Sequence, residues 1–342
     1  MTRRSSRSLL LTGLLATAST QAAAQGVADF YRGKVLTIIA GTDATGEYDA
    51  NARLFSRHLG RHIPGNPSII IQNMPGASGI TAANYLYTIA AKDGAVMGTF
   101  NKSMPLYQMT GMPNTKFKAQ DFNWIGSRDH ANNLVVVATR TGIRTIDDAT
   151  KKQATMGSIG IGGTMSTYPL ILNNTIGTKF KLVQGYAGGQ LVDLAVERGE
   201  VDGRGSYDWK DLKTKRSDWL RDRKVTILVQ FGLVREADLP DVPTPPELAR
   251  NEREKAALEF LSADIMMGKP LMMPPGVPAE RVEAMRKAFD ETVRDPLFLA
   301  DAKAIDADVN PIRGVELQGT VAKMVNTPAD ILELAKGLMV EK

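Results

Sequence analysis

Residues 35–55 read VLTIIAGTDATGEYDANARLF, and this stretch decides the fold. Residues 35–40 are a short apolar and β-branched run, which is typical of a buried strand. Residues 41–48 form a polar loop that contains glycine, and apolar side chains recur at helical spacing from 49 to 62. A strand, a glycine loop and a helix in this order predict an α/β fold with a largely parallel sheet.

The same alternation continues through the chain in two sets. Strands are predicted at 68–72 and 95–100 with a helix at 78–88, then strands at 134–138, 154–159, 180–183, 201–203 and 225–231 with helices at 164–176 and 190–198. A connector with four prolines at 239–246 precedes helices at about 252–264, 278–293, 295–304, 314–325 and 328–339. We therefore expect a first lobe at 25–127, a second at 128–233, and a return to the first lobe over 234–342.

Residues 1–24 have the pattern of a secretory signal peptide. Three arginines precede a short apolar stretch at 9–16, and Ala22-Ala23-Ala24 offers a cleavage site that would make Gln25 the mature start. No apolar run of about 18 residues follows that could span a membrane. These features predict a protein exported to the periplasm.

Composition excludes several kinds of protein. The chain has 342 residues, 43% hydrophobic and 23% charged, which is typical of a globular protein. It has no cysteine, so disulfides, thiolate metal sites and cysteine nucleophiles are excluded. The net charge of +5 includes three arginines of the leader, and no basic run with interleaved aromatics follows, so no nucleic-acid partner is expected.

Motifs for catalysis and cofactors are missing from the sequence. There is no GxSxG, HExxH or GxxxxGK[ST] pattern. Residues 160–165 resemble a dinucleotide-binding loop but lack its last glycine. The acidic residue that would bind the ribose, about twenty residues further along, is also missing. His58 and His62 have the i, i+4 spacing that can chelate a metal, but a helix-end role is favoured. We expect no cofactor, no metal and no enzymatic activity.

Two loops have the composition of an anion site. Residues 41–49 and 158–166 each join a strand to a helix, where unpaired N–H groups carry partial positive charge and glycines allow close approach. Tyr186 lies at a third such turn, and Arg204 between glycines could bind a carboxylate bidentately. The residues expected to bind the ligand are Thr42, Thr45, Gly46, Glu47, Tyr48, Asp49, Asn73, Ser103, Ser158, Gly160, Gly162, Gly163, Thr164, Ser166, Tyr186 and Arg204.

Several segments in order resemble the substrate-binding receptors of tripartite tricarboxylate transporters, the Bug family of periplasmic binding proteins. They are residues 48–54, 64–67, 72–77, 82–87, 92–94, 185–189, 197–204, 239–243 and 274–278. The resemblance implies a type II periplasmic-binding-protein fold, with two α/β lobes joined by two hinge strands and a cleft between them. It also implies that the loops at 42–49 and 158–166 hold a ligand carboxylate. The expected partners are a small carboxylate and inner-membrane transporter subunits or a sensor protein, with the receptor itself a monomer.

One loop departs from the family pattern. Where similar members carry three glycines before Tyr48, this chain has Thr45, Gly46 and Glu47. Either Glu47 points to solvent, or the ligand carries a positive group such as an amine, or binding has been lost. Two other readings stay open: a binding-dead or sensory receptor that acts through protein partners, and a secreted hydrolase or lyase. For the latter, the titratable candidates are Asp43, Glu47, Tyr48, Asp49 and His130.

Overall fold

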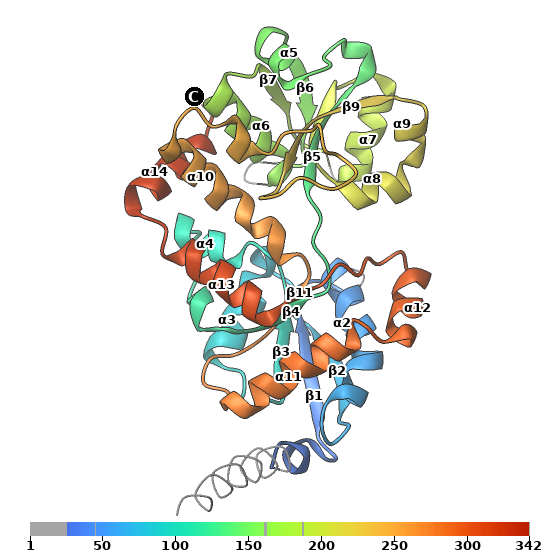
Figure 1. Ribbon diagram of the computed structural model, residues 1–342, viewed down its shortest axis with the longest axis vertical. Coiled ribbons are helices and arrows are strands. Elements are labelled where there is room, and N and C mark those ends of the chain that lie inside the picture. Colours follow the sequence, from blue (N-terminus) through green and yellow to red (C-terminus); the bar gives the residue numbers. More distant parts are fainter. Residues whose placement is uncertain (1–25, 45, 161–162, 187, 342) are drawn as a thin grey trace, which may run out of the picture. The chain divides into compact units, whose positions relative to one another are not determined.

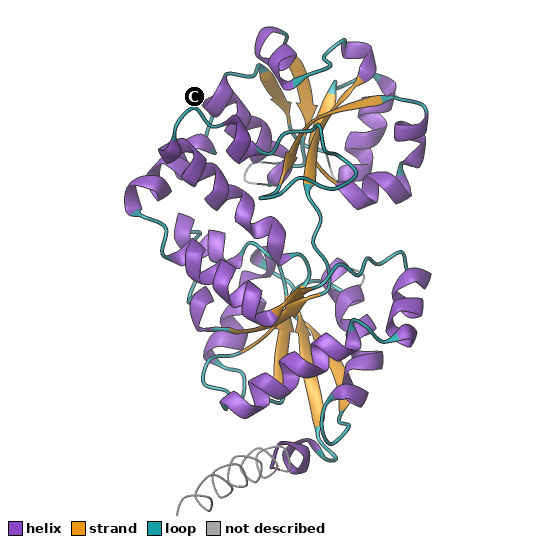
Figure 2. Ribbon diagram, viewed as in Figure 1, coloured by secondary structure: helices purple, strands orange, loops and turns teal. Residues whose placement is uncertain are grey.

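The computed structural model describes residues 26–44, 46–160, 163–186 and 188–341 (Figures 1 and 2). The predicted signal peptide lies outside these residues, as do Thr45 and Gly162. The chain divides into two compact units. Unit 1 comprises residues up to 104, 114–128 and 269–318, and unit 2 comprises 105–113, 129–268 and 319–342. The division falls within α4 (Met104–Thr110) and α13 (Gly314–Val325).

Unit 1 is built on a six-stranded mixed sheet with the order β11-β4-β10-β3-β1-β2. Three strands of the first half pair in parallel, with β1 between the other two, and β10 runs antiparallel to both β3 and β4. The strands are β1 (Val35–Ala40), β2 (Ser68–Asn73), β3 (Val96–Thr99), β4 (Asn123–Ser127), β10 (Pro270–Met273) and β11 (Ile312–Arg313). This arrangement places the carboxyl end of β1, where the chain enters the 41–48 loop, between the ends of two parallel neighbours.

Helices pack on this sheet through a shared aromatic core. The helices are α2 (Glu47–His58), α3 (Ile80–Thr88), α11 (Ala279–Thr292) and α12 (Pro296–Ala304), with short 3-10 turns at Leu59–His62, Ala77–Gly79 and Ala119–Asp121. Phe55 of α2 stacks on Phe289 of α11 at 5.6 Å and lies 5.1 Å from Phe298 of α12. Gly126 allows this packing, because a Cβ there would lie 2.2 Å from the Phe289 ring.

Unit 2 has a five-stranded sheet with the order β7-β6-β8-β5-β9. β6 pairs in parallel with β7 and β8, while β5 is antiparallel to β8 and β9. The strands are β5 (Asn133–Ala138), β6 (Ala154–Gly157), β7 (Phe180–Val183), β8 (Gly203–Asp208) and β9 (Val225–Phe231). The helices are α5 (Ile146–Lys151), α6 (Thr164–Ile176), α7 (Gly189–Arg198), α8 (Trp209–Lys215), α9 (Ser217–Arg221), α10 (Glu252–Ser262) and α14 (Ala329–Leu338), with 3-10 turns at Thr139–Thr141, Pro245–Leu248 and Ala263–Met267.

The predicted α/β class is confirmed, and so are many of the predicted elements. The strands at 35–40, 180–183 and 225–231 and the helices at 164–176 and 314–325 have the predicted bounds. The strand predicted at 201–203 lies instead at Gly203–Asp208. Residues 234–268 and 319–341, which the sequence predicts to return to the first lobe, lie in unit 2, where α10 contacts α14 and the Pro245–Leu248 turn.

No helix among residues 26–44, 46–160, 163–186 and 188–341 combines the length and the apolar character needed to cross a membrane.

Candidate functional site

In unit 1, the loop after β1 leads into an uncapped helix start. Gly41 is held tightly, since a Cβ there would lie 2.5 Å from Phe100 Cβ. The N-cap of α2 is Gly46, and no side chain among the described residues caps it. The Gly46 carbonyl accepts from the amide of Ala50 at 3.0 Å, which begins the helical ladder. A helix start without a side-chain cap is a favourable place for an anion.

Glu47, the first residue of α2, is paired with a lysine far away in sequence. Its Oε2 lies 3.0 Å from Nζ of Lys269, and its side chain is 62% exposed against 21% for Lys269. Desolvation raises the pKa of Glu47, but Lys269, Lys102 and Arg128 together outweigh it and leave that pKa below its usual value. Glu47 is therefore an ionised carboxylate held at the helix start, with part of its surface in solvent.

Asp49 and Asn73 brace the loop. Asp49 is buried and accepts from Nε and Nη2 of Arg53, one turn further along α2, at 2.7 and 3.1 Å. Nδ2 of Asn73 donates to Oδ1 of Asp49 at 2.8 Å and to the Thr42 carbonyl at 3.1 Å. Asp49 and Asn73 both belong to the predicted ligand set. In the structure they connect the end of β2 to the loop and hold the loop in position.

The other predicted residues of unit 1 lie near the same helix start. Tyr48 is buried, and its hydroxyl accepts from the amide of Lys102 at 3.2 Å. The amide of Ser103 donates to Oδ1 of Asn101 at 3.0 Å, which fixes the turn after β3. Oγ1 of Thr42 is buried and has no hydrogen-bond partner within the described part of the chain.

In unit 2, the loop after β6 leads into a second uncapped helix start. Gly163 is the N-cap of α6, and no side-chain cap is present in the described residues. Ser158 and Ser166 are buried and hydrogen-bonded to each other, and Oγ of Ser166 also donates to the Gly160 carbonyl at 2.8 Å. The hydroxyls of both serines therefore hold the loop in shape, while Gly160 and Gly163 leave space where a side chain would stand.

The remaining predicted residues of unit 2 lie around this loop. Thr164 is the first residue of α6 and is half-buried. Tyr186 is also half-buried, and its amide donates to the Ser158 carbonyl at 3.3 Å. That bond ties the turn after β7 to the loop after β6.

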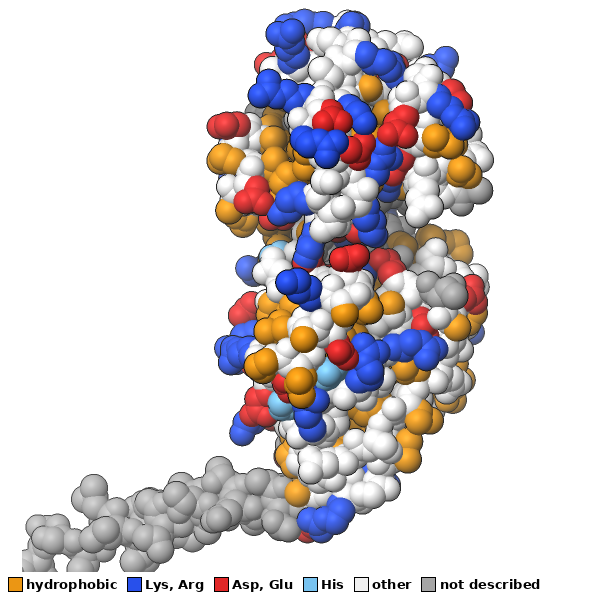
Figure 3. Space-filling model, turned by 90° about the vertical axis from the view of Figure 1, so that its right-hand side faces the viewer, with side chains coloured by type: hydrophobic (Ala, Val, Ile, Leu, Met, Phe, Trp, Pro, Cys, Tyr) orange, Lys and Arg blue, Asp and Glu red, His pale blue; other side chains and the backbone are white. Residues whose placement is uncertain are grey.

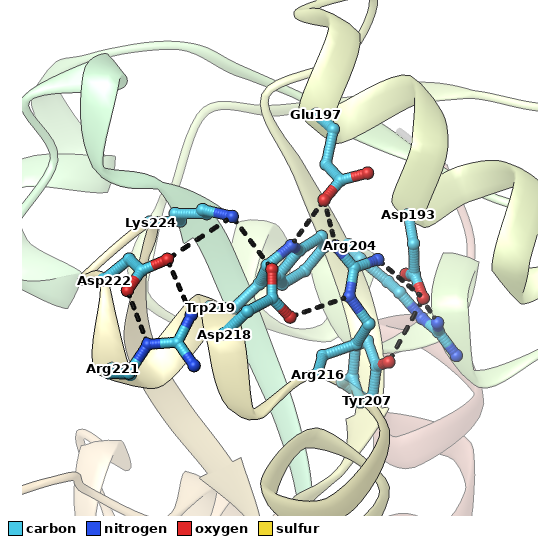
Figure 4. A network of polar contacts seen from close by, with 10 residues as sticks. All are labelled: Asp193, Glu197, Arg204, Tyr207, Arg216, Asp218, Trp219, Arg221, Asp222 and Lys224. Atoms are coloured by element: carbon cyan, nitrogen blue, oxygen red, sulfur yellow. Dashed lines mark hydrogen bonds and ion pairs between the residues drawn. The ribbon is translucent and has the colours of Figure 1, made fainter.

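Arg204 belongs to a polar network at α7, β8 and α9 (Figure 4). Its Nη1 lies 2.8 Å from Oδ1 of Asp193, and its guanidinium stacks 4.1 Å from the centre of the Tyr207 ring. The Tyr207 hydroxyl donates to Oδ2 of Asp193 at 3.1 Å. Arg216 extends the network to Glu197. The guanidinium of Arg204 is thus engaged within unit 2, and ligand contact by it stays a prediction.

His58 and His62 join α2 and its 3-10 extension to α12. Nε2 of His58 lies 2.8 Å from Oδ2 of Asp301, and Nε2 of His62 lies 2.8 Å from Oδ2 of Asp295. No group of three or more His, Cys, Asp or Glu side chains in the described ranges could hold a metal ion. Figure 3 shows histidine side chains beside acidic and basic ones on one face. The pair therefore helps to hold α12 against α2.

Sequence reasoning missed Lys269 as a site residue. Nothing in the local sequence pattern around Lys269 points to Glu47. A lysine immediately before an apolar strand was the available signal. The structure brings it to the α2 start because β10 inserts between β3 and β4.

Comparisons with known proteins define the fold. No protein-family model and no curated protein matches the sequence. A ligand-free TctC solute-binding protein from Polaromonas has a TM-score of 0.67 at 18% identity, over 89% of this chain and 97% of that one. The periplasmic binding protein BugD has a TM-score of 0.56 at 19% identity, over 90% and 98%. MatC from Rhodopseudomonas palustris with bound malate also has a TM-score of 0.56 at 19% identity, over 87% and 98%.

These likenesses confirm, at the level of the fold, the resemblance inferred from the sequence. The chain has the fold of the TctC and Bug solute-binding proteins along most of its length.

Proposed function

We propose that this chain is an extracytoplasmic receptor that binds a small carboxylate-containing metabolite and delivers it to a membrane transporter of the tripartite tricarboxylate type. The leader-like residues 1–24 support export to the periplasm. The similarly folded MatC was solved with malate, and another Rhodopseudomonas palustris protein of this fold, with a TM-score of 0.57, was solved with adipate. The two ligands share carboxylate chemistry.

The observation that carries the proposal is the uncapped glycine start of α2 and of α6. Each follows a sheet strand, and each has a glycine N-cap without a side-chain hydrogen bond in the described residues. Amides at a helix N-terminus favour a carboxylate through both hydrogen bonding and the helix dipole. That the two loops act on one ligand, in the cleft expected from the sequence, is part of the proposal.

Space at the second loop supports the same reading. A Cβ at Gly160 would meet no atom within 4 Å, and one at Gly163 would meet only the Gly160 carbonyl oxygen, at 3.9 Å. Neither residue has the positive φ that requires glycine. Because packing and backbone do not demand glycine at these positions, close approach of a ligand to the backbone is a reason for it.

A hydrolase or lyase is less well supported by the same residues. Among the candidate acids, the Asp49 carboxylate already accepts hydrogen bonds from Arg53 and Asn73, and the Glu47 carboxylate is ion-paired with Lys269. A general base needs access to a substrate proton. A binding-dead or sensory receptor remains the second candidate, because Glu47 places a carboxylate at the α2 start.

Mass spectrometry of small molecules released from natively purified protein tests the proposal. We expect a carboxylate at close to one molecule per chain, and thermal stabilisation of the stripped protein by that molecule through mass action. A stripped protein that no mono-, di- or tricarboxylate stabilises at millimolar concentration would overturn the proposal. Conversion of the identified ligand to a product would favour an enzyme instead.

A further inference from the structure

Three cations act on the carboxylate at the start of α2. Lys269 contacts Glu47 directly at 3.0 Å, and Lys102 and Arg128 act on the same carboxylate through their charges. The other acid of this turn, Asp49, is already bonded to Arg53. These cations favour a carboxylate at this position, whether it belongs to Glu47 or to a ligand.

The two side chains of the pair differ in burial, and the backbone of Lys269 is held by hydrogen bonds to unit 1. The Lys269 carbonyl accepts from the Arg128 amide at 3.3 Å and from Nδ2 of Asn51 at 3.4 Å. The Lys269 ammonium also lies 5.9 Å from the centre of the Tyr48 ring. Glu47 has a flexible side chain that is 62% exposed. Exposed ion pairs contribute little net free energy, so the Glu47 carboxylate can leave Lys269 at small cost.

A buried hydroxyl beside the same helix start points independently to a missing acceptor or donor. Oγ1 of Thr42 is buried, and no hydrogen-bond partner for it exists among the described residues. It lies next to the N-cap, since a Cβ on Gly46 would be 2.5 Å from it. Buried hydroxyls are nearly always hydrogen-bonded. A ligand oxygen at the α2 start would supply the partner once the Thr42 side chain turns towards it.

We propose that Glu47 is a built-in competitor of the ligand: its carboxylate occupies Lys269 until a ligand carboxylate displaces it. This inference rests on the proposed receptor function and adds to it a residue that sets affinity and selects the ligand's charge. A ligand carboxylate at this position would meet Lys269, Lys102 and Arg128, the cations that now favour the ionised form of Glu47. A ligand ammonium is disfavoured, because it would add positive charge beside Lys102, Arg128 and Lys269.

Calorimetric titration of the full mature chain with malate, adipate and aspartate tests this inference. Malate and aspartate differ only in a hydroxyl against an ammonium group, so they form a matched pair. Glu47→Gln should tighten malate and adipate binding about two- to fivefold, the range expected for an exposed ion pair. Glu283→Gln removes an exposed carboxylate that pairs with Arg286 on α11, outside the loop after β1, and we expect it to leave both affinities nearly unchanged.

Lys269→Gln provides the converse variant. It should weaken dicarboxylate binding at least tenfold, and Glu47→Gln in that background should then have no effect, because the competitor has lost its partner. Lys287→Gln, at an exposed lysine of α11, is the matched control and should bind as the parent does. Thermal unfolding of each variant separates loss of fold from loss of binding.

The outcomes separate this inference from the proposed function. If the parent binds a dicarboxylate and Glu47→Gln binds it no more tightly, the inference fails and the receptor function stands. If Glu47→Gln weakens aspartate binding while sparing malate, Glu47 instead holds a ligand ammonium, and the inference fails. If a dicarboxylate binds to the Glu47→Gln variant but not to the parent, the result supports the inference that Glu47 competes with the ligand. If neither protein binds any carboxylate, both proposals fail.

Discussion

Nη1 of Arg204 lies 2.8 Å from Oδ1 of Asp193, and both side chains are largely buried. The pair joins β8 to α7, and the Tyr207 hydroxyl bonds the second oxygen of the same carboxylate. Burial raises the pKa of Tyr207 beyond its usual range, so its hydroxyl stays protonated and donates. Arg204, which the sequence suggests as a ligand contact, thus stabilises unit 2.

We predict that Arg204→Gln destabilises the protein by about 2 kcal/mol, because it removes the cation bonded to buried Asp193 at 2.8 Å and leaves that carboxylate with Arg216 at 3.9 Å. Urea unfolding followed by tryptophan fluorescence measures this loss. Arg198→Gln, at an exposed arginine 3.8 Å from Glu200, should change the free energy of unfolding little. If Arg204→Gln unfolds like the parent but no longer binds ligand, Arg204 is a ligand contact after all.

Gly268 is predicted to tolerate no side chain. Its φ is +43°, and a Cβ would lie 1.6 Å from the Asp129 carbonyl oxygen. The backbone conformation alone costs a non-glycine residue about 1–3 kcal/mol, and the clash adds to that. Gly268→Ala should therefore lower the unfolding midpoint in urea. In Gly337→Ala the added methyl meets open space within α14, so we expect a gain of up to about 1 kcal/mol.

The free energy of unfolding should depend on pH through the ionisation of Asp49. Burial raises the pKa of Asp49, but the hydrogen bonds from Arg53 and Asn73 outweigh burial and leave that pKa below its usual value. Asp49 therefore stabilises the fold above the unfolded-state pKa of about 4, and this contribution is lost as the pH falls through the lower folded-state pKa.

Asp49→Asn should consequently flatten the fall in unfolding free energy below about pH 4. At neutral pH we expect it to cost about 1–3 kcal/mol, because it removes a charge-assisted acceptor of Arg53. Urea unfolding at a series of pH values measures both effects. An acid dependence equal to that of the parent would contradict the assigned role of Asp49.

Gly163→Val separates binding from folding. The Cβ of the added side chain lies 3.9 Å from the nearest atom outside the neighbouring residues, so the main cost to folding is the poorer N-cap, about 1 kcal/mol. The same side chain would cover the first amides of α6, and we expect carboxylate affinity to fall at least tenfold. Gly319→Val, at another glycine with open space, should retain the parent affinity. Equal affinities in the two variants would remove the α6 start from the site.

Much of the fold follows from local patterns that the sequence displays directly. The apolar run at 35–40 and the helix Thr164–Ile176 have clear ends, because glycines or polar loops bound them. β4 and β10 were missed, since their short runs contain Trp124, Gly126 and Pro270 and lie among proline-rich or aromatic neighbours. Their strand character depends on pairing with each other across more than 140 residues of sequence, which no local pattern reveals.

The site shows the same limit. Gly46 and Gly163 could be found as helix starts because a strand and a glycine loop precede each of them. The roles of individual side chains could not, because Asp49, Asn73, Ser158 and Ser166 have the same composition whether they face a ligand or brace a loop. The pairing of Glu47 with Lys269 joins residues 222 positions apart, and it exists only once β10 has entered the sheet.

Isothermal titration of the stripped mature protein with a panel of mono-, di- and tricarboxylates tests the central claim most directly. We predict saturable binding of at least one carboxylate at one site per chain, with affinity lost in Gly163→Val but kept in Gly319→Val. The absence of binding heat for every member at millimolar concentration, in a protein that unfolds cooperatively, would contradict the claim.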